Sequence, residues 1–168
     1  MDVQELRALQ APLKEAYTTD PGQAVVTLRA QGTPGEGVTC SVATGRAVAV
    51  AGLHPATGGS GAELCSGDML LEALVACAGV TLRAVTTALD FTLGPRASVV
   101  AEGDLDFRGA LGVAKEAPVG FRSIRLLFDL DTDEPQERID AVLKLTERYC
   151  VVLQTIAVTP ELAVSTAD

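Results

Sequence analysis

A long apolar segment in the middle of the chain constrains the fold more than any other part of the sequence. Helix-forming residues run over about residues 68–89, after a loop rich in glycine and proline, and Ser66 or Asp68 is placed to cap the helix. The segment is apolar on nearly all sides, whereas a helix on the surface of a globular protein has a polar stripe. We therefore expect a central helix that a sheet or a second subunit covers, and hence a homodimer.

The same segment is too short to predict a membrane span. Its most hydrophobic window, residues 69–82, includes Glu72, and a bilayer requires about 20 predominantly apolar residues. The N-terminal sequence MDVQELRALQAPLKEAY is charged and amphipathic, without the basic start and apolar run of a signal peptide. These features predict a cytoplasmic protein that does not contact membranes.

Length and charge restrict the remaining classes. A chain of 168 residues fits a single domain, residues 1–168, in which residues 1–20 form an N-terminal helical extension that ends at Asp20-Pro21-Gly22. The net charge is −9, and Lys and Arg do not cluster as phosphate binding requires. Nucleic acid is therefore not an expected partner.

Alternation and turn residues predict the other elements. Strands are expected over residues 24–30, 37–43 and 47–52 as an antiparallel meander, over residues 97–107 and 122–131 as a pair, and over residues 157–164 at the end of the chain. A second helix is expected to begin at Pro135 and to end near Cys150. The predicted class is α+β, with the order β-β-β-α-β-β-α-β after the N-terminal helix.

Two of the four cysteines are candidates for chemistry. Cys77 and Cys150 both lie in apolar, helix-prone segments, and together they would form a buried dithiol suited to redox reactions if folding joins them. Burial as an inert thiol is the alternative for each, and it is the simpler interpretation for Cys40 and Cys65. Because the chain has no CxxC motif and a single histidine, His54, it predicts neither a zinc ribbon nor a multi-histidine metal site.

The motifs around these cysteines resemble those of the OsmC/Ohr family. LLEALVACAGVTL is similar to the helix that carries the family's first cysteine, ERYCVVLQTI to its second-cysteine motif, and HPATGG and CSGDMLLEAL to segments of its OsmC-like branch. The resemblance covers about residues 24–164. It implies an intertwined homodimer that reduces organic hydroperoxides, with Cys77 peroxidatic, Cys150 resolving, an external dithiol as reductant and no metal, flavin or other cofactor.

The chain departs from the family pattern at the groups that support the thiol. The peroxidase branch supplies an arginine from the turn between its first two strands, and here that turn contains GTPGEG. Arg29 and Arg46 flank the region and are the candidates to reach inward. Asp68 is the nearest acid to the family's glutamate position, but nine helical residues separate it from Cys77, so it is better placed as a helix cap. Glu72 is a second candidate.

Three functions remain open from the sequence. The first is a cysteine-based peroxidase acting on a small hydrophobic peroxide. The second is a binding module without catalysis, in which the same apolar pocket holds a small or thiol-reactive metabolite, and the missing arginine favours it. The third is a redox sensor whose disulfide alters a partner contact.

Overall fold

The structure is a computed structural model that describes residues 3–34, 40–42, 51–62 and 64–166. It begins with helix α1 (Val3–Thr19), which includes Pro12, and the predicted N-terminal helix is confirmed. Asp20 accepts a hydrogen bond from the Gly22 amide and caps the 3-10 helix η1 (Pro21–Ala24). Tyr17 and Ala24 are buried against Phe107 and Leu111, which attaches this end of the chain to the body of the protein.

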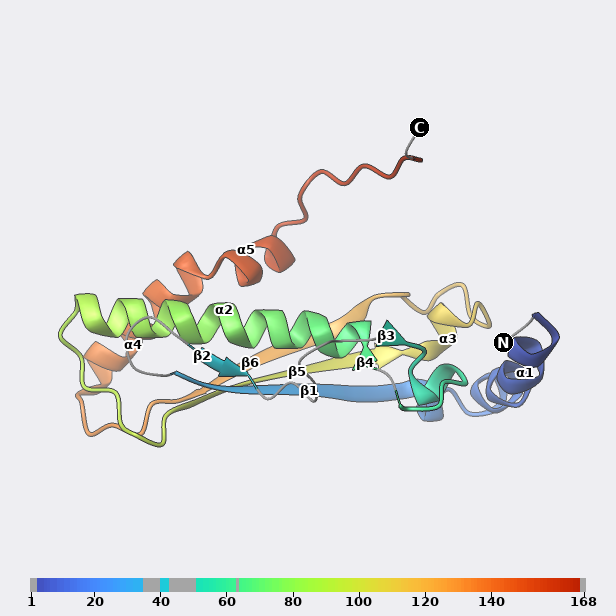
Figure 1. The fold of residues 1–168 in the computed structure, drawn as a ribbon, viewed down its shortest axis with the longest axis horizontal. Helices are drawn as coiled ribbons and strands as arrows, with labels where there is room; N and C mark the ends of the chain where they lie inside the picture. The colour runs from blue at the N-terminus through green and yellow to red at the C-terminus, as the bar shows by residue number, and fades with distance from the viewer. Residues whose placement is uncertain (1–2, 35–39, 43–50, 63, 167–168) are drawn as a thin grey trace.

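An antiparallel four-stranded sheet in the order β2-β1-β5-β6 forms one layer of the molecule (Figure 1). Its strands are β1 (Val25–Pro34), β2 (Cys40–Val42), β5 (Ser98–Asp106) and β6 (Phe121–Asp129). Along β5 and β6 one face is apolar and the other is polar, the alternation typical of a sheet with one solvated face. The predicted pairing of the two longer strands is confirmed.

Helix α2 (Ser66–Ala88) lies along the apolar face of the sheet (Figure 1). Eight of its residues are buried, and they recur every three or four positions: Leu71, Leu74, Val75, Ala78, Gly79, Leu82, Val85 and Thr86. The central helix predicted from the sequence is confirmed. Its N-cap residue is Cys65, rather than the predicted Ser66 or Asp68, because the helix already begins at Ser66. By length and composition alone α2 is also long and apolar enough to cross a membrane, but buried core helices of globular proteins share these properties.

Helix α4 (Gln136–Tyr149) packs antiparallel to α2. At its start, Arg138 donates hydrogen bonds to the carbonyl oxygens of Leu89 and Asp90, at 2.9 and 2.8 Å, and so attaches α4 to the end of α2. At its end, Cys150 returns to the middle of α2, and the short helix α5 (Val151–Ala157) follows. The sequence predicted the second helix with nearly these bounds.

Short elements complete the described chain. They are β3 (Ala51–Gly52) and β4 (Leu64–Cys65), which pair in parallel, the 3-10 helix η2 (Pro55–Thr57) and the one-turn helix α3 (Phe107–Ala110). The predicted third strand of the meander is therefore wrong in its described part. Residues 51–52 do not join the main sheet but pair with the segment that leads into α2, while residues 47–50 lie outside the described residues.

The predicted last strand is also wrong. Residues 151–157 form helix α5, and residues 158–166 have no regular structure and are exposed. Figure 1 shows α5 and the C-terminal segment on the side of α2 away from the sheet. A strand requires a neighbour for its backbone N–H and C=O groups, and none of the described strands pairs with the alternating residues 157–164. The α+β class with a long central helix is confirmed, but the final β of the predicted order is absent.

Candidate dithiol site

Cys77 lies on the side of α2 that the sheet does not cover. The buried residues of α2 face the sheet and α4, whereas Cys77 is half-buried and shares its side of the helix with Leu70 and Ala84. These residues are seven apart, which places them in one stripe along a helix of 3.6 residues per turn. The stripe is apolar although it is partly exposed, so it differs from the polar outer face of an ordinary surface helix.

Folding brings the thiol of Cys150 to Cys77. Cys150 is fully buried at the junction of α4 and α5, within the cluster against which Cys77 packs. Burial raises the pKa of the Cys150 thiol to about 11; the Leu153 and Val152 amides oppose that rise, and a hydrogen bond with the Cys77 side chain adds to it. The two sulfurs, 73 residues apart in sequence, are thus neighbours, and both are free thiols.

A buried hydroxyl lies one helical turn before Cys150. Thr146 has no exposed surface, and its Oγ1 has no hydrogen-bond partner within the described part of the chain. The backbone carbonyl of the same residue accepts the Cys150 amide at 3.0 Å, so the two residues occupy successive turns of α4. The sequence predicts the helix that carries Thr146, but the missing partner of its hydroxyl is visible only in the structure.

An apolar cavity of about 540 Å³ opens between α2, β6 and α5. Leu70 from the Cys77 stripe, Phe121 from β6 and Leu153 from α5 line it together with one cation, Arg122. Arg122 is exposed, and it contributes to lowering the pKa of the buried Asp106 carboxyl, after the larger contribution of the Arg108 hydrogen bond. The sequence offers no reason to expect Arg122 at the site, because it lies 45 residues from Cys77 and 28 from Cys150 along the chain.

The two candidate acids lie at the start of α2, away from the thiols. Nine helical residues place Asp68 about 13 Å along the axis from Cys77. Burial raises the pKa of Asp68, which the nearby His54 partly offsets. The pKa of Glu72 is raised by burial and then by Asp68. The structure therefore groups Asp68 with His54, and Glu72 with Asp68, rather than with the sulfurs.

His54 belongs to a second cavity, of about 450 Å³, that adjoins the first at Leu70 and Phe121. Its Nδ1 accepts the Ala56 amide at 3.0 Å, and its ring stacks on Phe107 with centroids 4.8 Å apart. Cys65 lines the same cavity as a free thiol. Across the described residues, no group of three or more His, Cys, Asp or Glu side chains is arranged to hold a metal ion.

The structure does not test the predicted roles of Arg29 and Arg46. Arg29 lies in β1 with its backbone paired to Glu102 of β5, and its side chain is outside the described residues, as is the whole of Arg46. The backbone of Cys40 is in β2, and its side chain is likewise not described. The predictions for these residues therefore remain untested.

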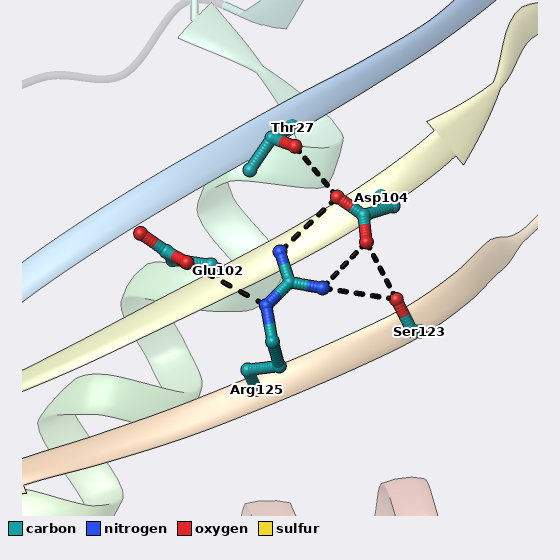
Figure 2. A network of polar contacts seen from close by, with 5 residues as sticks. All are labelled: Thr27, Glu102, Asp104, Ser123 and Arg125. Atoms are coloured by element: carbon teal, nitrogen blue, oxygen red, sulfur yellow. Dashed lines mark hydrogen bonds and ion pairs between the residues drawn. The ribbon is translucent and has the colours of Figure 1, made fainter.

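The polar face of the sheet carries an ion-pair network (Figure 2). Asp104 accepts hydrogen bonds from Thr27 at 2.6 Å, from Ser123 at 2.7 Å and from Arg125 Nη2 at 3.1 Å, and Arg125 also lies 3.5 Å from Glu102. These donors hold the pKa of Asp104 well below its usual range. Because the network joins β1, β5 and β6 on the face opposite α2, it serves the register of the sheet rather than the dithiol.

A family model and a solved structure both match this chain. Residues 59–165, more than half of the chain and including both cysteines, match the family model described as OsmC-like protein. The crystal structure of an OsmC-like hydroperoxide resistance protein from Jannaschia sp. CCS1 superimposes with a TM-score of 0.58 at 17% sequence identity, covering 83% of this chain and 91% of that one. This likeness establishes a shared fold. No curated protein sequence matches the chain.

Proposed function

Because the chain belongs to the OsmC-like protein family and its fold joins two thiols, we propose that it reduces organic hydroperoxides with Cys77 and Cys150. The observation that carries the proposal is the contact between the half-buried Cys77 and the buried Cys150. Because Cys77 is the more exposed thiol, it is the one that reacts with the peroxide, and Cys150 resolves the resulting sulfenic acid. The name of the Jannaschia structure, a hydroperoxide resistance protein, agrees with this choice of substrate.

The reaction takes place in two steps. The Cys77 thiolate attacks one peroxide oxygen, so that an S–O bond forms, the O–O bond breaks and the alcohol leaves after taking a proton. Cys150 then attacks the sulfenic sulfur, so that the S–S bond forms and the S–O bond breaks. Hydroxide leaves and combines with the proton released by Cys150 to form water. Two electrons pass from the thiols to the peroxide, and an external dithiol must reduce the disulfide before the next turnover.

The cavity between α2, β6 and α5 supports an apolar substrate. Neither cysteine lines it, but Leu153 does, and the Leu153 amide bonds to the Cys150 sulfur. The lining of the cavity is mostly aliphatic and aromatic, and it shares Leu70 with the stripe of α2 that carries Cys77. A hydrocarbon group would lose its contact with water there, which favours organic hydroperoxides over hydrogen peroxide. Arg122 supplies a positive charge at this cavity in place of the arginine that the GTPGEG turn lacks.

We further propose that the working form is a homodimer. The apolar stripe of α2 is partly exposed in one copy of the chain, and it continues into a groove of about 300 Å³ lined by Thr81, Ala84 and Tyr149 among others. The C-terminal part of the chain exposes further large apolar side chains: Val151, Val158, Leu162 and Val164. A second copy that covered these surfaces would remove them from water and would enclose the cavity between α2, β6 and α5. Light scattering of the purified protein tests this, and a monomer would contradict it.

The catalytic proposal is tested with a pair of variants. Wild-type protein is mixed with cumene hydroperoxide and a dithiol, and peroxide consumption is followed. We expect Cys77→Ser to abolish turnover, and Cys150→Ser to abolish the intramolecular disulfide while Cys77 is still oxidised. The matched control is Cys65→Ser, which removes a free half-buried thiol outside the contact and should leave the rate unchanged. Normal turnover by Cys77→Ser, or no reaction of the wild type, would refute the proposal and favour a binding function.

A further inference from the structure

The Thr146 hydroxyl is a buried polar group with no assigned role in the two reaction steps. A threonine within a helix ordinarily donates its hydroxyl proton to the carbonyl four residues earlier. Thr18, Thr87 and Thr155 all do so here, to Lys14, Arg83 and Val151, at 2.7 to 2.8 Å. Thr146 is the one of these four that is fully buried, yet its Oγ1 lacks a partner within the described residues. Leaving such a group unpaired costs stability.

The position of Thr146 directs attention to the dithiol. Residues four apart lie on the same face of a helix, and helical side chains point back toward the N-terminus, over the preceding turn. Cys150 is four residues after Thr146, with its amide bonded to the Thr146 carbonyl, and both side chains are buried. Cys150 itself is the cap residue between α4 and α5, so its buried side chain and the free hydroxyl lie about one helical turn apart at the end of α4.

The resolving step is favoured by a further hydrogen-bond donor to Cys150, beside the amides of Leu153 and Val152 that already lower its pKa. Cys150 is neutral in the reduced protein, and it must become a thiolate in order to attack Cys77. An anionic sulfur in an apolar core is strongly disfavoured unless donors surround it. In the reduced protein the neutral thiol makes a smaller demand, so a hydroxyl near it can remain without a partner.

We infer that Thr146 serves the resolving step: its hydroxyl turns to donate a hydrogen bond to the Cys150 sulfur as that sulfur becomes a thiolate and attacks Cys77. This assignment rests on the dithiol function proposed above, because it deepens the role of Cys150. The hydroxyl is then unpaired in the reduced protein, at some cost in stability, because its hydrogen bond forms only during the attack.

The test isolates the attack of Cys150 without peroxide. In a Cys40→Ser, Cys65→Ser background, 2,2′-dithiodipyridine reacts with Cys77 to give a pyridyl disulfide and one thiopyridone. The Cys150 thiolate then attacks the Cys77 sulfur, forming the S–S bond and breaking the bond to the second thiopyridone. The absorbance of thiopyridone shows two phases, and the second phase measures the attack by Cys150.

Two substitutions at Thr146 separate its hydroxyl from its packing. Thr146→Val keeps the shape and removes the hydroxyl, and we expect it to slow the second phase by about three- to tenfold. Losing a hydrogen bond to a charged group lowers the fraction of thiolate by roughly ten- to 100-fold. The more basic thiolate is also more nucleophilic, which offsets about half of this loss on a logarithmic scale. Thr146→Ser keeps the hydroxyl and should remain within about twofold of the wild type, while the first phase is unchanged in both.

Stability is expected to rank the variants in the opposite order. Valine removes an unsatisfied hydroxyl, so Thr146→Val should be at least as stable as the wild type, whereas Thr146→Ser loses a buried methyl group and should be less stable. Closure rates that follow stability, or equal second phases for valine and threonine, would overturn the inference. A wild type that closes its disulfide in this assay but does not react with cumene hydroperoxide would refute the peroxidase proposal and leave the role of Thr146 standing.

Discussion

Gly103 of β5 is the position where a single methyl group should perturb the cavity wall most directly. A Cβ placed on this glycine would lie 2.4 and 2.6 Å from two ring atoms of Phe121, and 3.4 Å from the fully buried Leu71. Phe121 lines both cavities beside α2. Since ordinary contact begins near 3.4 Å, Gly103→Ala would force the ring back by about 1 Å.

The expected cost follows from two opposing effects. Inserting a methyl group into a packed site costs about 1–3 kcal/mol, and alanine returns about 0.4–1 kcal/mol because it restricts the unfolded chain. We therefore expect Gly103→Ala to lower the free energy of unfolding by about 1–2 kcal/mol. For a chain of this size, each kcal/mol corresponds to a fall in Tm of about 2–4 °C.

Gly120 provides a matched control. Gly120 lines both cavities and comes directly before Phe121, the first residue of β6. A Cβ on Gly120 would meet nothing within 4 Å. Gly120→Ala should be neutral or stabilising by up to about 1 kcal/mol. Guanidinium unfolding of the reduced proteins at one protein concentration measures both, with the midpoint carrying the difference and the slope unchanged. Equal midpoints for the two variants would refute the reasoning about Gly103.

Three further predictions concern charge and thiol chemistry. The hydrogen bond from Arg108 lowers the pKa of Asp106, so the ionised Asp106 stabilises the fold above pH ~4, and this stabilisation is lost as the pH falls below that value. Asp106→Asn should be less stable than the wild type at pH 7 and should lose less stability on acidification, as measured by unfolding at several pH values. Arg122→Gln should raise the KM for a carboxylate-bearing hydroperoxide by about two- to fivefold, as expected for an exposed ion pair, with the KM for cumene hydroperoxide as the control that stays unchanged. Cys150→Ala should leave Cys77 as a sulfenic acid after one equivalent of peroxide, detected as a dimedone adduct by mass spectrometry; a Cys77–Cys65 disulfide instead would contradict the assigned pairing.

The sequence predicted the elements that depend on local pattern. The helix spacing of residues 68–89 and 135–150 and the alternation of residues 97–107 and 122–131 correspond to α2, α4, β5 and β6 within a few residues. Each of these signals comes from side chains that face one common core, so period and composition are sufficient to find them. The strand predicted over residues 157–164 failed because alternation shows which residues could pair and does not supply a neighbouring strand.

The sequence by itself determined the apolar central helix, the two long strands and the presence of two cysteines in helix-prone segments, because these properties are local. The tertiary structure alone decided that the sulfurs of Cys77 and Cys150 are neighbours, that Asp68 lies near His54 instead, and that Arg122 borders the cavity. It also showed that the Thr146 hydroxyl is buried without a partner in the described chain. Contacts between residues distant in sequence depend on how α4 is laid against α2, and burial and hydrogen bonding are properties of that packing rather than of any segment.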